Sequence, residues 1–172
     1  MDPRGDPFDP SPGTRRIGPA TVAPQTVRKR HASPGATATV TEFAFTTEFD
    51  VRYRDLDPLE HVNNAVYATY LETARLEYLT AVLGRSLATG ESVLAHLSLD
   101  FRRSVTFEDS VTVAVGVTDV GGSSIRMEYE IRAGGEVAAT AETVLVTVED
   151  GDPTPVPGDW RTAIEEFEGG VD

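Results

Sequence analysis

The feature that most constrains the fold of this chain is one long apolar stretch between two helix-boundary signals. The stretch runs from about Asn64 to Leu83, with an asparagine before it and Gly84 after it, as is typical of helix ends. Its apolar and aromatic side chains cover more than one face of the expected helix: Val66, Tyr67, Tyr70, Leu71, Ala74, Leu76, Tyr78, Leu79 and Val82. Other parts of the chain must therefore cover this helix.

Alternating sequence patterns predict strands that can provide this cover. Residues 43–53 alternate between apolar and polar side chains, which predicts a half-buried strand. The patterns of 92–103, 111–117 and 124–132 predict three more strands, and residues 136–149 predict a fifth. The fifth has apolar side chains on both faces, as a central strand covered on each side would have.

The predicted order is one strand, the long helix, and four strands in meander-like antiparallel succession. Gly121-Gly122 and Gly134-Gly135 separate strands at points where two-residue hairpin turns need positive φ angles. This order places the chain in the α+β class, with a five-stranded antiparallel sheet around one long central helix.

The length and composition limit the chain to one folded domain with tails. With 172 residues, of which 40% are hydrophobic, the chain can bury one core and is too short for two ordinary domains. We expect a disordered tail over residues 1–39 and a folded domain over residues 40–150. Residues 151–172 would form a linker and a short C-terminal helix or tail. Translation starting nearer Val40 is an alternative, which the intact mass of the native protein would decide.

The charge is distributed unevenly and favours a salt-rich environment. Residues 1–40 hold six basic and three acidic residues, whereas residues 41–172 hold nine basic and 25 acidic ones. The formal net charge is −13, and Lys29 is the one lysine of the chain. Mobile ions screen such a self-repelling surface, so we expect adaptation to a high-salt cytoplasm, with an ordinary acidic cytosolic protein as the alternative. A domain this acidic is a poor partner for nucleic acid.

Several chemistries are excluded by what the sequence lacks. The chain has no cysteine, which rules out disulfides, thiol nucleophiles and thiolate metal sites. It has no Gly-x-Ser-x-Gly motif, phosphate-binding loop, dinucleotide fingerprint or metal-ligand cluster, so we expect neither metal nor cofactor. No apolar run reaches the roughly 18 residues of a membrane span, and we expect a soluble cytoplasmic protein.

A carboxylate, Asp57, precedes the predicted helix at the point where Pro58 ends the first strand. The first backbone N–H groups of a helix have no internal partner and, with the helix dipole, present a positive potential to an incoming oxygen. A carbonyl bound there would be polarised while Asp57 faces it, which is the minimum needed to hydrolyse an activated ester or thioester. The alternative is that Asp57 only forms a turn, since Asp-Pro is common in turns.

The sequence around this junction resembles a known family signature. The run Arg52-Tyr53-Arg54-Asp55-Leu56-Asp57-Pro58 is followed by His61-Val62-Asn63-Asn64, and then by Tyr67, Tyr70 and Glu72. It resembles the signature of the hotdog-fold acyl-CoA thioesterases, above all the 4-hydroxybenzoyl-CoA thioesterase-like branch and its acyl-ACP thioesterase relatives. The resemblance extends with weaker motifs from about Val40 to Val148. It implies the hotdog fold, in which a five-stranded antiparallel sheet wraps around one long central helix.

The resemblance implies roles for three residues near the helix start. Asp57 would act as a nucleophile or as a general base that activates water, and the backbone N–H of Asn64 would hold the oxyanion. The side chain of Asn64, or that of Asn63, would at the same time serve as a helix cap. His61 would orient the thioester or bind the catalytic water, as a histidine does in the acyl-ACP thioesterase relatives. Those relatives have an asparagine where this chain has Leu59, so a structural role for His61 stays open.

Four further residues are candidates with open alternatives. Glu72 lies a little over two helical turns after Asn64, and another hotdog branch places its catalytic carboxylate at about this spacing. It would otherwise pair with an arginine on the helix surface. Arg102 and Arg103 resemble the family's basic positions near the nucleotide and pyrophosphate of CoA, with surface salt bridges as the alternative. Tyr67, together with Tyr70 and phenylalanine residues, would line the acyl pocket, whether that pocket is aromatic or aliphatic.

The predicted function is hydrolysis of an acyl-CoA thioester to a free acid and CoA, without a cofactor. The resemblance also implies a homodimer or homotetramer with its sites at subunit interfaces. The alternatives are a non-catalytic module that binds acyl-CoA and, on the same fold, a dehydratase. The sequence does not identify the acyl group, and it leaves both Asp57 and Glu72 open as the main catalytic carboxylate.

Overall fold

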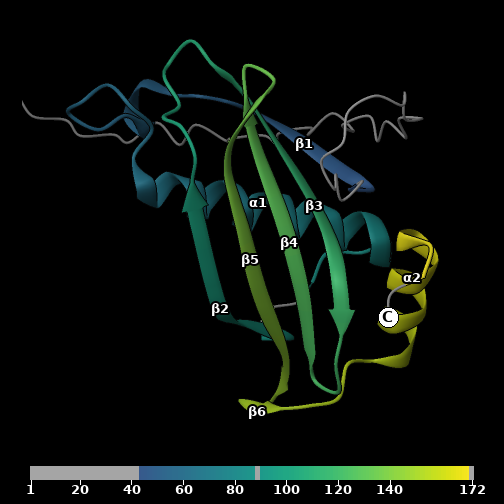
Figure 1. Cartoon of the computed structure of the whole chain (residues 1–172). Coiled ribbons are helices and arrows are strands. Elements are labelled where there is room, and N and C mark those ends of the chain that lie inside the picture. The colour runs from purple at the N-terminus through teal and green to yellow at the C-terminus, as the bar shows by residue number, and fades with distance from the viewer. Residues whose placement is uncertain (1–42, 88–89, 171–172) are drawn as a thin grey trace, which may run out of the picture.

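In the computed structural model, which describes residues 43–87 and 90–170, a curved antiparallel sheet lies against two α-helices (Figure 1). The elements in chain order are β1 (Phe45–Asp50), η1 (Tyr53–Asp55), α1 (Asn64–Leu83), β2 (Ser92–Phe101), β3 (Ser110–Val120), β4 (Ser124–Ala133), β5 (Glu136–Glu149), β6 (Asp152–Pro153) and α2 (Gly158–Glu168). The predicted α+β class and five-stranded sheet are confirmed, with β6 as a short addition that pairs with β5. The tail predicted for residues 1–39 lies outside the described residues.

Helix α1 has the bounds that its boundary residues predict. The Asn63 side chain caps its start, where Oδ1 accepts a hydrogen bond from the Ala65 N–H at 2.9 Å. Gly84 follows its end with a φ of 67°, a left-handed conformation that a residue without a Cβ adopts at little cost. The Asn63 cap satisfies a backbone N–H that the helix leaves open, and the left-handed Gly84 turns the chain out of the helix.

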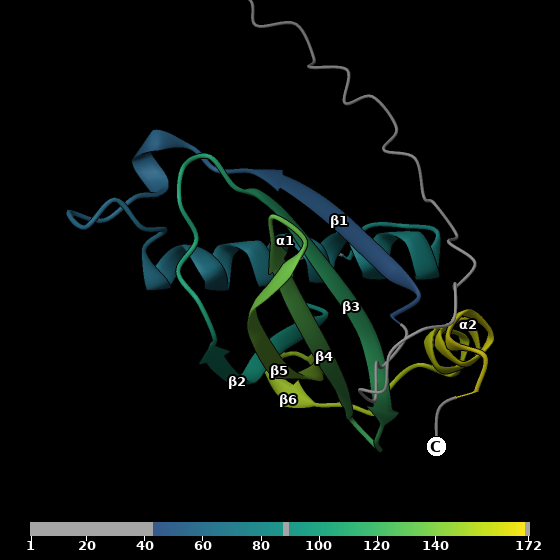
Figure 2. The same cartoon turned by 45° about the horizontal axis from the view of Figure 1, so that its top comes forward.

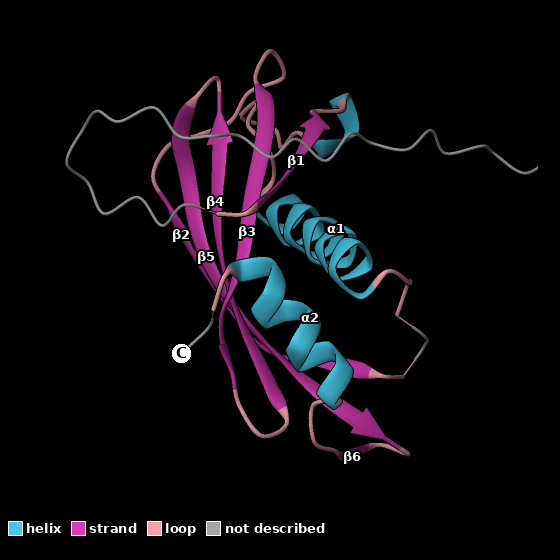
Figure 3. Cartoon of the chain, turned by 90° about the vertical axis from the view of Figure 1, so that its right-hand side faces the viewer, coloured by secondary structure: helices cyan, strands magenta, loops and turns pink. Residues whose placement is uncertain are grey.

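The inner face of the sheet and α1 bury one another. Val113, Ile131 and Ala139, one from each of the three middle strands, are fully buried together with Tyr78 of α1. Figure 3 shows α1 and α2 on the same side of the sheet, and Figure 2 shows β1 running alongside α1. The predicted cover is complete on the inward side of α1, while Leu76 on the other side remains 46% exposed.

The strand order in the sheet corrects the predicted meander. The strands follow the order β1-β3-β4-β5-β2, so β2 pairs with β5 and not with β3, its successor in the sequence. Alternation predicts which segments are strands, but strand partners depend on long-range packing that no local pattern encodes. Strand β5 also differs from its prediction, because its inward residues such as Thr143 are buried whereas outward ones such as Val144 are half-buried.

Two boundary predictions need further correction. The first strand was expected over residues 43–53, but β1 ends at Asp50 because a 3-10 turn, η1, already begins at Tyr53. The hairpin at Gly134-Gly135 has the expected positive φ angles of 58° and 87°. The connection at Gly121-Gly122 includes a third residue before β4 starts, and neither glycine has a positive φ.

Helix α2 completes the open edge of β3 beyond the start of β1. Strand β1 reaches only as far as the pair Phe45 and Val115, and past that point side chains of α2 bind the β3 backbone. Glu168 Oε1 accepts hydrogen bonds from the Val117 N–H at 2.9 Å and from the Tyr78 hydroxyl at 2.5 Å. Arg161 donates to the carbonyls of Val120 and Gly121 at 2.6 and 2.7 Å. The predicted apolar side of this helix, Trp160, Ile164 and Phe167, packs on the core.

We expect Ile164→Ala to lower the free energy of unfolding by about 2–5 kcal/mol, because it leaves a cavity under a fully buried side chain. Urea unfolding would measure the change. Glu165→Ala, on the exposed side of the same helix, is the control and should stay within about 0.5 kcal/mol of the wild type. Equal effects of the two substitutions would show that α2 does not pack on the domain in solution.

Candidate active site

The loop between β1 and α1 folds back on itself around Asp57. Leu56 and Val62 form an antiparallel bridge, and within it the Asp57 N–H donates to the His61 carbonyl at 2.8 Å. The Glu60 N–H donates to the Asp57 carbonyl at 3.0 Å, which closes the turn. Pro58 at the turn removes one donor and fixes φ, so the chain reverses direction directly after Asp57.

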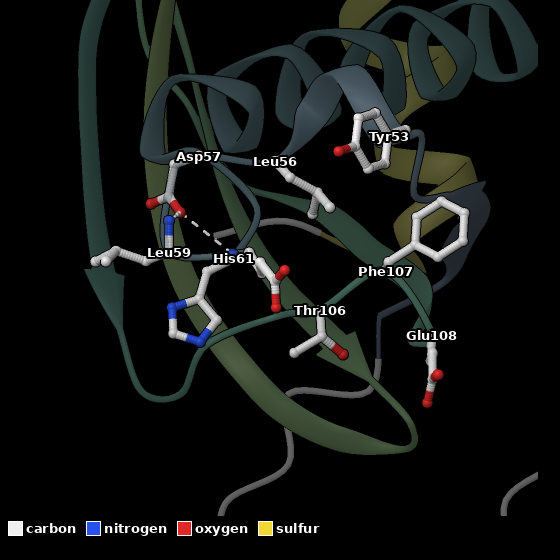
Figure 4. Close-up of a pocket in the computed structure, with 9 residues that line it drawn as sticks. Tyr53, Leu56, Asp57, Leu59, His61, Thr106, Phe107 and Glu108 are labelled. Carbon is white, nitrogen blue, oxygen red and sulfur yellow. Dashed lines mark hydrogen bonds between the residues drawn. The ribbon is translucent and has the colours of Figure 1, made fainter.

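The Asp57 carboxylate is held by the backbone through one of its oxygens. Oδ1 accepts hydrogen bonds from the Leu59 N–H at 2.8 Å and from the His61 N–H at 3.2 Å (Figure 4). No described residue donates to Oδ2. The carboxylate is therefore oriented by amides that do not titrate, and its second oxygen can accept a proton or attack a carbon.

Glu60 occupies a strained position in this loop. Its φ of 62° lies in the left-handed region, which disfavours side chains with a Cβ, and Asp150 is the other such residue among the described non-glycines. The conformation aims the Leu59 and His61 amides at Asp57, which is the kind of constraint that concentrates at functional sites.

The start of α1 follows this loop directly. The Asn63 side chain is the cap, and the backbone N–H of Asn63 donates to the Asp55 carbonyl at 2.8 Å. No hydrogen bond joins the Asn64 N–H to another described residue. The structure thus confirms the cap at Asn63 and leaves the Asn64 N–H open to an external oxygen at the positive end of the helix.

A pocket of about 680 Å³ lies between this loop and the loop that joins β2 to β3. The two loops are linked by a bridge between His61 and Thr106 and by a hydrogen bond from the Val62 N–H to the Val105 carbonyl at 2.8 Å. The lining residues are Tyr53, Leu56, Asp57, Leu59, Glu60, His61, Thr106, Phe107 and Glu108 (Figure 4). Asp57 and His61 therefore line one cavity.

The pocket combines an apolar rim with negative charge. Tyr53, Leu59 and Phe107 are 83%, 74% and 54% exposed, so three large apolar side chains gather at its mouth. Glu60 and Glu108 join Asp57 in the lining, and no lysine or arginine does. Exposed apolar groups in one place indicate a surface that binds an apolar ligand or a partner.

Tyr67, one turn into α1, faces the core and does not line this pocket. It is 2% exposed, and its ring packs edge-on against Phe101 of β2 with centroids 5.0 Å apart. Burial raises the pKa of Tyr67, with Arg103 acting in the opposite direction and Asp109 adding to the rise. Phe101 itself is 47% exposed, so any contact of this pair with an acyl group occurs on the open side of Phe101.

The two adjacent arginines after β2 have different environments. The Arg103 guanidinium donates to the Ala133 carbonyl at 2.5 Å and to Asp109 Oδ1 at 3.1 Å, contacts that secure the loop leading into β3. Backbone hydrogen bonds from Thr106, together with Arg103, lower the pKa of Asp109. Arg102 is exposed, and its side chain forms no ion pair with a described residue.

Glu72 lies apart from the Asp57 pocket within a single chain. It is an exposed residue of α1 and is absent from the lining of that pocket. The predicted spacing of Asn64 and Glu72 along the helix holds, but it does not bring Glu72 and Asp57 into one cavity.

The loop of Thr106, Phe107 and Glu108 is the part of the pocket that sequence reasoning missed. Its residues follow β2 in the sequence and meet His61 only because β2 crosses to the far edge of the sheet. The available signal was Phe107, a large apolar residue in a segment that fits no strand pattern.

No group of three or more His, Asp or Glu side chains in the described part of the chain is arranged to hold a metal ion. Neither α-helix of that part is long and apolar enough to cross a membrane.

Comparisons with known proteins agree with the predicted resemblance. Residues 51–164 match the family model described as the thioesterase-like superfamily. The chain is 27% identical over 108 residues to the long-chain acyl-CoA thioesterase FadM of Escherichia coli, a match that covers 60% of this chain and 82% of FadM. A thioesterase from Thermus thermophilus, solved with coenzyme A and Zn, is 42% identical with a TM-score of 0.71, and covers 75% of this chain and 97% of its own. A DHNA-CoA thioesterase from Staphylococcus aureus is 27% identical with a TM-score of 0.64, covering 72% and 90%.

We expect Glu60→Gly to raise the free energy of unfolding by up to about 1 kcal/mol. Relief of the left-handed conformation is worth about 1–2 kcal/mol, against about 0.5–1 kcal/mol for the greater freedom of glycine when unfolded. Urea unfolding would measure the difference, with Glu60→Ala as the control that keeps the Cβ and the strain. A Glu60→Gly protein less stable than Glu60→Ala would contradict the left-handed conformation.

Proposed function

The chain belongs to the thioesterase-like superfamily, and on that premise we propose that it hydrolyses an acyl-CoA thioester to a free acid and CoA. The relatives whose names specify a substrate act on long-chain acyl-CoA and on DHNA-CoA, which are both CoA thioesters. The observation that carries the proposal is the Asp57 carboxylate, held at Oδ1 by two amides just before the open start of α1.

In this mechanism the thioester carbonyl lies at the start of α1. The Asn64 N–H donates to the carbonyl oxygen, and its hydrogen bond strengthens as negative charge develops there. Asp57 Oδ2 either takes a proton from a water molecule that attacks the carbonyl carbon, or attacks that carbon itself. The C–S bond then breaks, the sulfur leaves as the CoA thiol after taking up a proton, and water supplies the oxygen of the free acid.

His61 and Glu72 are secondary candidates in this proposal. His61 lines the same pocket as Asp57 and is half-buried, a placement suited to holding the attacking water or the thioester. Glu72 would take part only if a second copy of the chain brought it to the site, since it lies outside the Asp57 pocket of its own chain.

For the CoA portion we propose Arg102 as the main contact. Its exposed guanidinium can pair with a phosphate, and Arg fits phosphate oxygens well. Arg103 would contribute less, because its donors already bind Asp109 and the Ala133 carbonyl. Tyr67, through its contact with Phe101, would shape the wall next to the acyl group.

We further propose that two copies associate through β2, giving a homodimer that can assemble into a tetramer. Strand β2 is an edge of the sheet, so one side of its backbone is unpaired. From Leu94 onward, its residues that share a face with the buried side of β5 are apolar, and Leu94, Leu97 and Phe101 among them are 45%, 38% and 47% exposed. A second copy would pair the edge and cover this row.

The acidic surface supports the proposal that the protein works at high ionic strength. The net charge of −13 and the single lysine agree with a cytoplasm of high ionic strength, in which self-repulsion is screened. Activity should therefore be assayed in molar KCl as well as at low salt.

Free-thiol release from short, long and aromatic acyl-CoAs would test the function. We expect Asp57→Asn to lower kcat by about 10²–10⁴-fold, the usual contribution of a general base, while the protein stays folded. The asparagine Oδ1 can still accept the Leu59 and His61 amides, so the loop is preserved and only the carboxylate is lost. Asp100→Asn, an exposed change on β2, is the matched control.

The other outcomes of that assay separate the alternatives. Undiminished release by Asp57→Asn would move the catalytic role to Glu72. A folded wild type that binds acyl-CoA without releasing thiol would identify a binding module and end the hydrolase proposal.

We expect Leu97→Glu to reduce the assembly to single chains in sedimentation experiments, since it places a charge in the uncovered row of β2. Val93→Glu is the control, because Val93 is similarly exposed at 49% but lies on the opposite face of the same strand. A wild type that sediments as one chain at micromolar concentration would refute the assembly proposal.

A further inference from the structure

Asp55 is the one acidic residue of the signature run that the proposed chemistry leaves without a role. It lies two residues before Asp57 but does not line the pocket of Asp57. It lines instead a separate groove between β1 and α1, together with Tyr70 of α1. The Asp55 residue is half-buried.

Asp55 forms hydrogen bonds with residues on both sides of the Asp57 loop, Arg52 before it and Asn63 after it. Its Oδ2 accepts a hydrogen bond from the Arg52 N–H at 2.9 Å, and its N–H donates to the Arg52 carbonyl at 2.8 Å, which together close the η1 turn. Its carbonyl accepts the Asn63 N–H at 2.8 Å, one residue before the proposed oxyanion donor. Asp55 thus holds the segment before Asp57, through Arg52, and the segment before Asn64, through Asn63.

Tyr70 meets Asp55 from the second turn of α1. The Tyr70 side chain is 6% exposed and packs on Phe49 with ring centroids 4.9 Å apart, so its position is fixed. Its buried hydroxyl forms no hydrogen bond with a described residue, which is a costly state for such a group. Burial and the nearby Asp55 carboxylate raise the pKa of Tyr70 to about 12, so the hydroxyl keeps its proton and remains a donor.

We propose that Asp55 is a positioning residue, which with the Tyr70 hydroxyl holds the Asp57 carboxylate in place relative to the Asn64 N–H. The inference rests on the proposed function. The Tyr70 hydroxyl is a buried donor that lines the same groove as Asp55, and a hydrogen bond to the Asp55 carboxylate would link the loop to α1 by a charge-assisted bond. Asp55 acts through Asp57 and Asn63 and does not contact the substrate.

Kinetics of Asp55→Ala and Tyr70→Phe would test this role. We expect each to lower kcat by about 10–100-fold while KM changes by less than about twofold, since small misplacements of a catalytic group have effects of this size. The double variant should lose no more than the more affected single variant, because both remove one link. Asp55→Asn, which can still accept both donors, should recover most of the activity.

Stability and backbone exchange separate positioning from a purely structural role. Tyr70→Phe removes only the proposed hydrogen bond to Asp55 and keeps the buried ring, so the variant should stay folded under the assay conditions, and lost kcat then cannot be attributed to unfolding. Amide hydrogen exchange over residues 52–64 should be faster in Asp55→Ala than in Asp50→Ala, a control that alters another carboxylate of the same groove. Wild-type kcat in folded Asp55→Ala, or unchanged exchange, would overturn the proposal.

The two proposals fail in distinguishable ways. A wild type that releases no thiol from any acyl-CoA would refute the proposed hydrolysis, whereas the exchange experiment needs no substrate and still decides whether Asp55 holds the loop. Loss of activity in Asp57→Asn together with full activity in Asp55→Ala would keep the hydrolase and reject the positioning residue.

Discussion

The contact between α1 and the inner face of the sheet is the interaction on which the rest of this structure depends. Tyr78 and Leu71 of the helix are buried with Val113 and Ile131 of the sheet, and at about 1.5–3 kcal/mol for each large side chain such burial dominates the stability. This packing fixes the position of the helix axis, and therefore the position of the unpaired N–H groups at the helix start. The candidate site lies at that end, where the first backbone N–H groups of the helix have no partner within the helix.

The loop before α1 converts this fixed helix end into a candidate catalytic arrangement. Two amides orient the Asp57 carboxylate. Glu60, which lies between the two residues that donate them, has an unfavourable left-handed φ. None of these groups depends on a flexible side chain, which lowers the reorganisation needed when a substrate binds. The facing part of the pocket wall, Thr106, Phe107 and Glu108, comes from a separate loop, so Phe107 can vary without a change in the segment that holds the carboxylate.

Local sequence signals predicted the elements well and their partners poorly. The bounds of α1 follow from Asn63 and Gly84 because caps act over a few residues, and β5 was predicted from its start to its end. The pairing of β2 with β5, and hence the meeting of His61 with Thr106, depends on contacts between distant segments. The left-handed Glu60 was equally hidden, since a glutamate gives no sign of an unusual φ. Asp57 and His61 line one pocket, whereas Glu72 lies outside it.

The strand order also sets the sequence of events while the chain is being made. Strands β1 and β2 leave the ribosome before their partners, β3 and β5, have been synthesised. Helix α1, which lies between β1 and β2 in the chain, also emerges before those partners. The hairpins β3–β4 and β4–β5 involve neighbouring residues and can form quickly, while β1 and β2 must close long loops to reach the two edges. A helix with apolar groups on several faces therefore stays exposed until the later strands have been synthesised. Such exposed apolar surface favours aggregation of the nascent chain unless synthesis is fast or chaperones bind it.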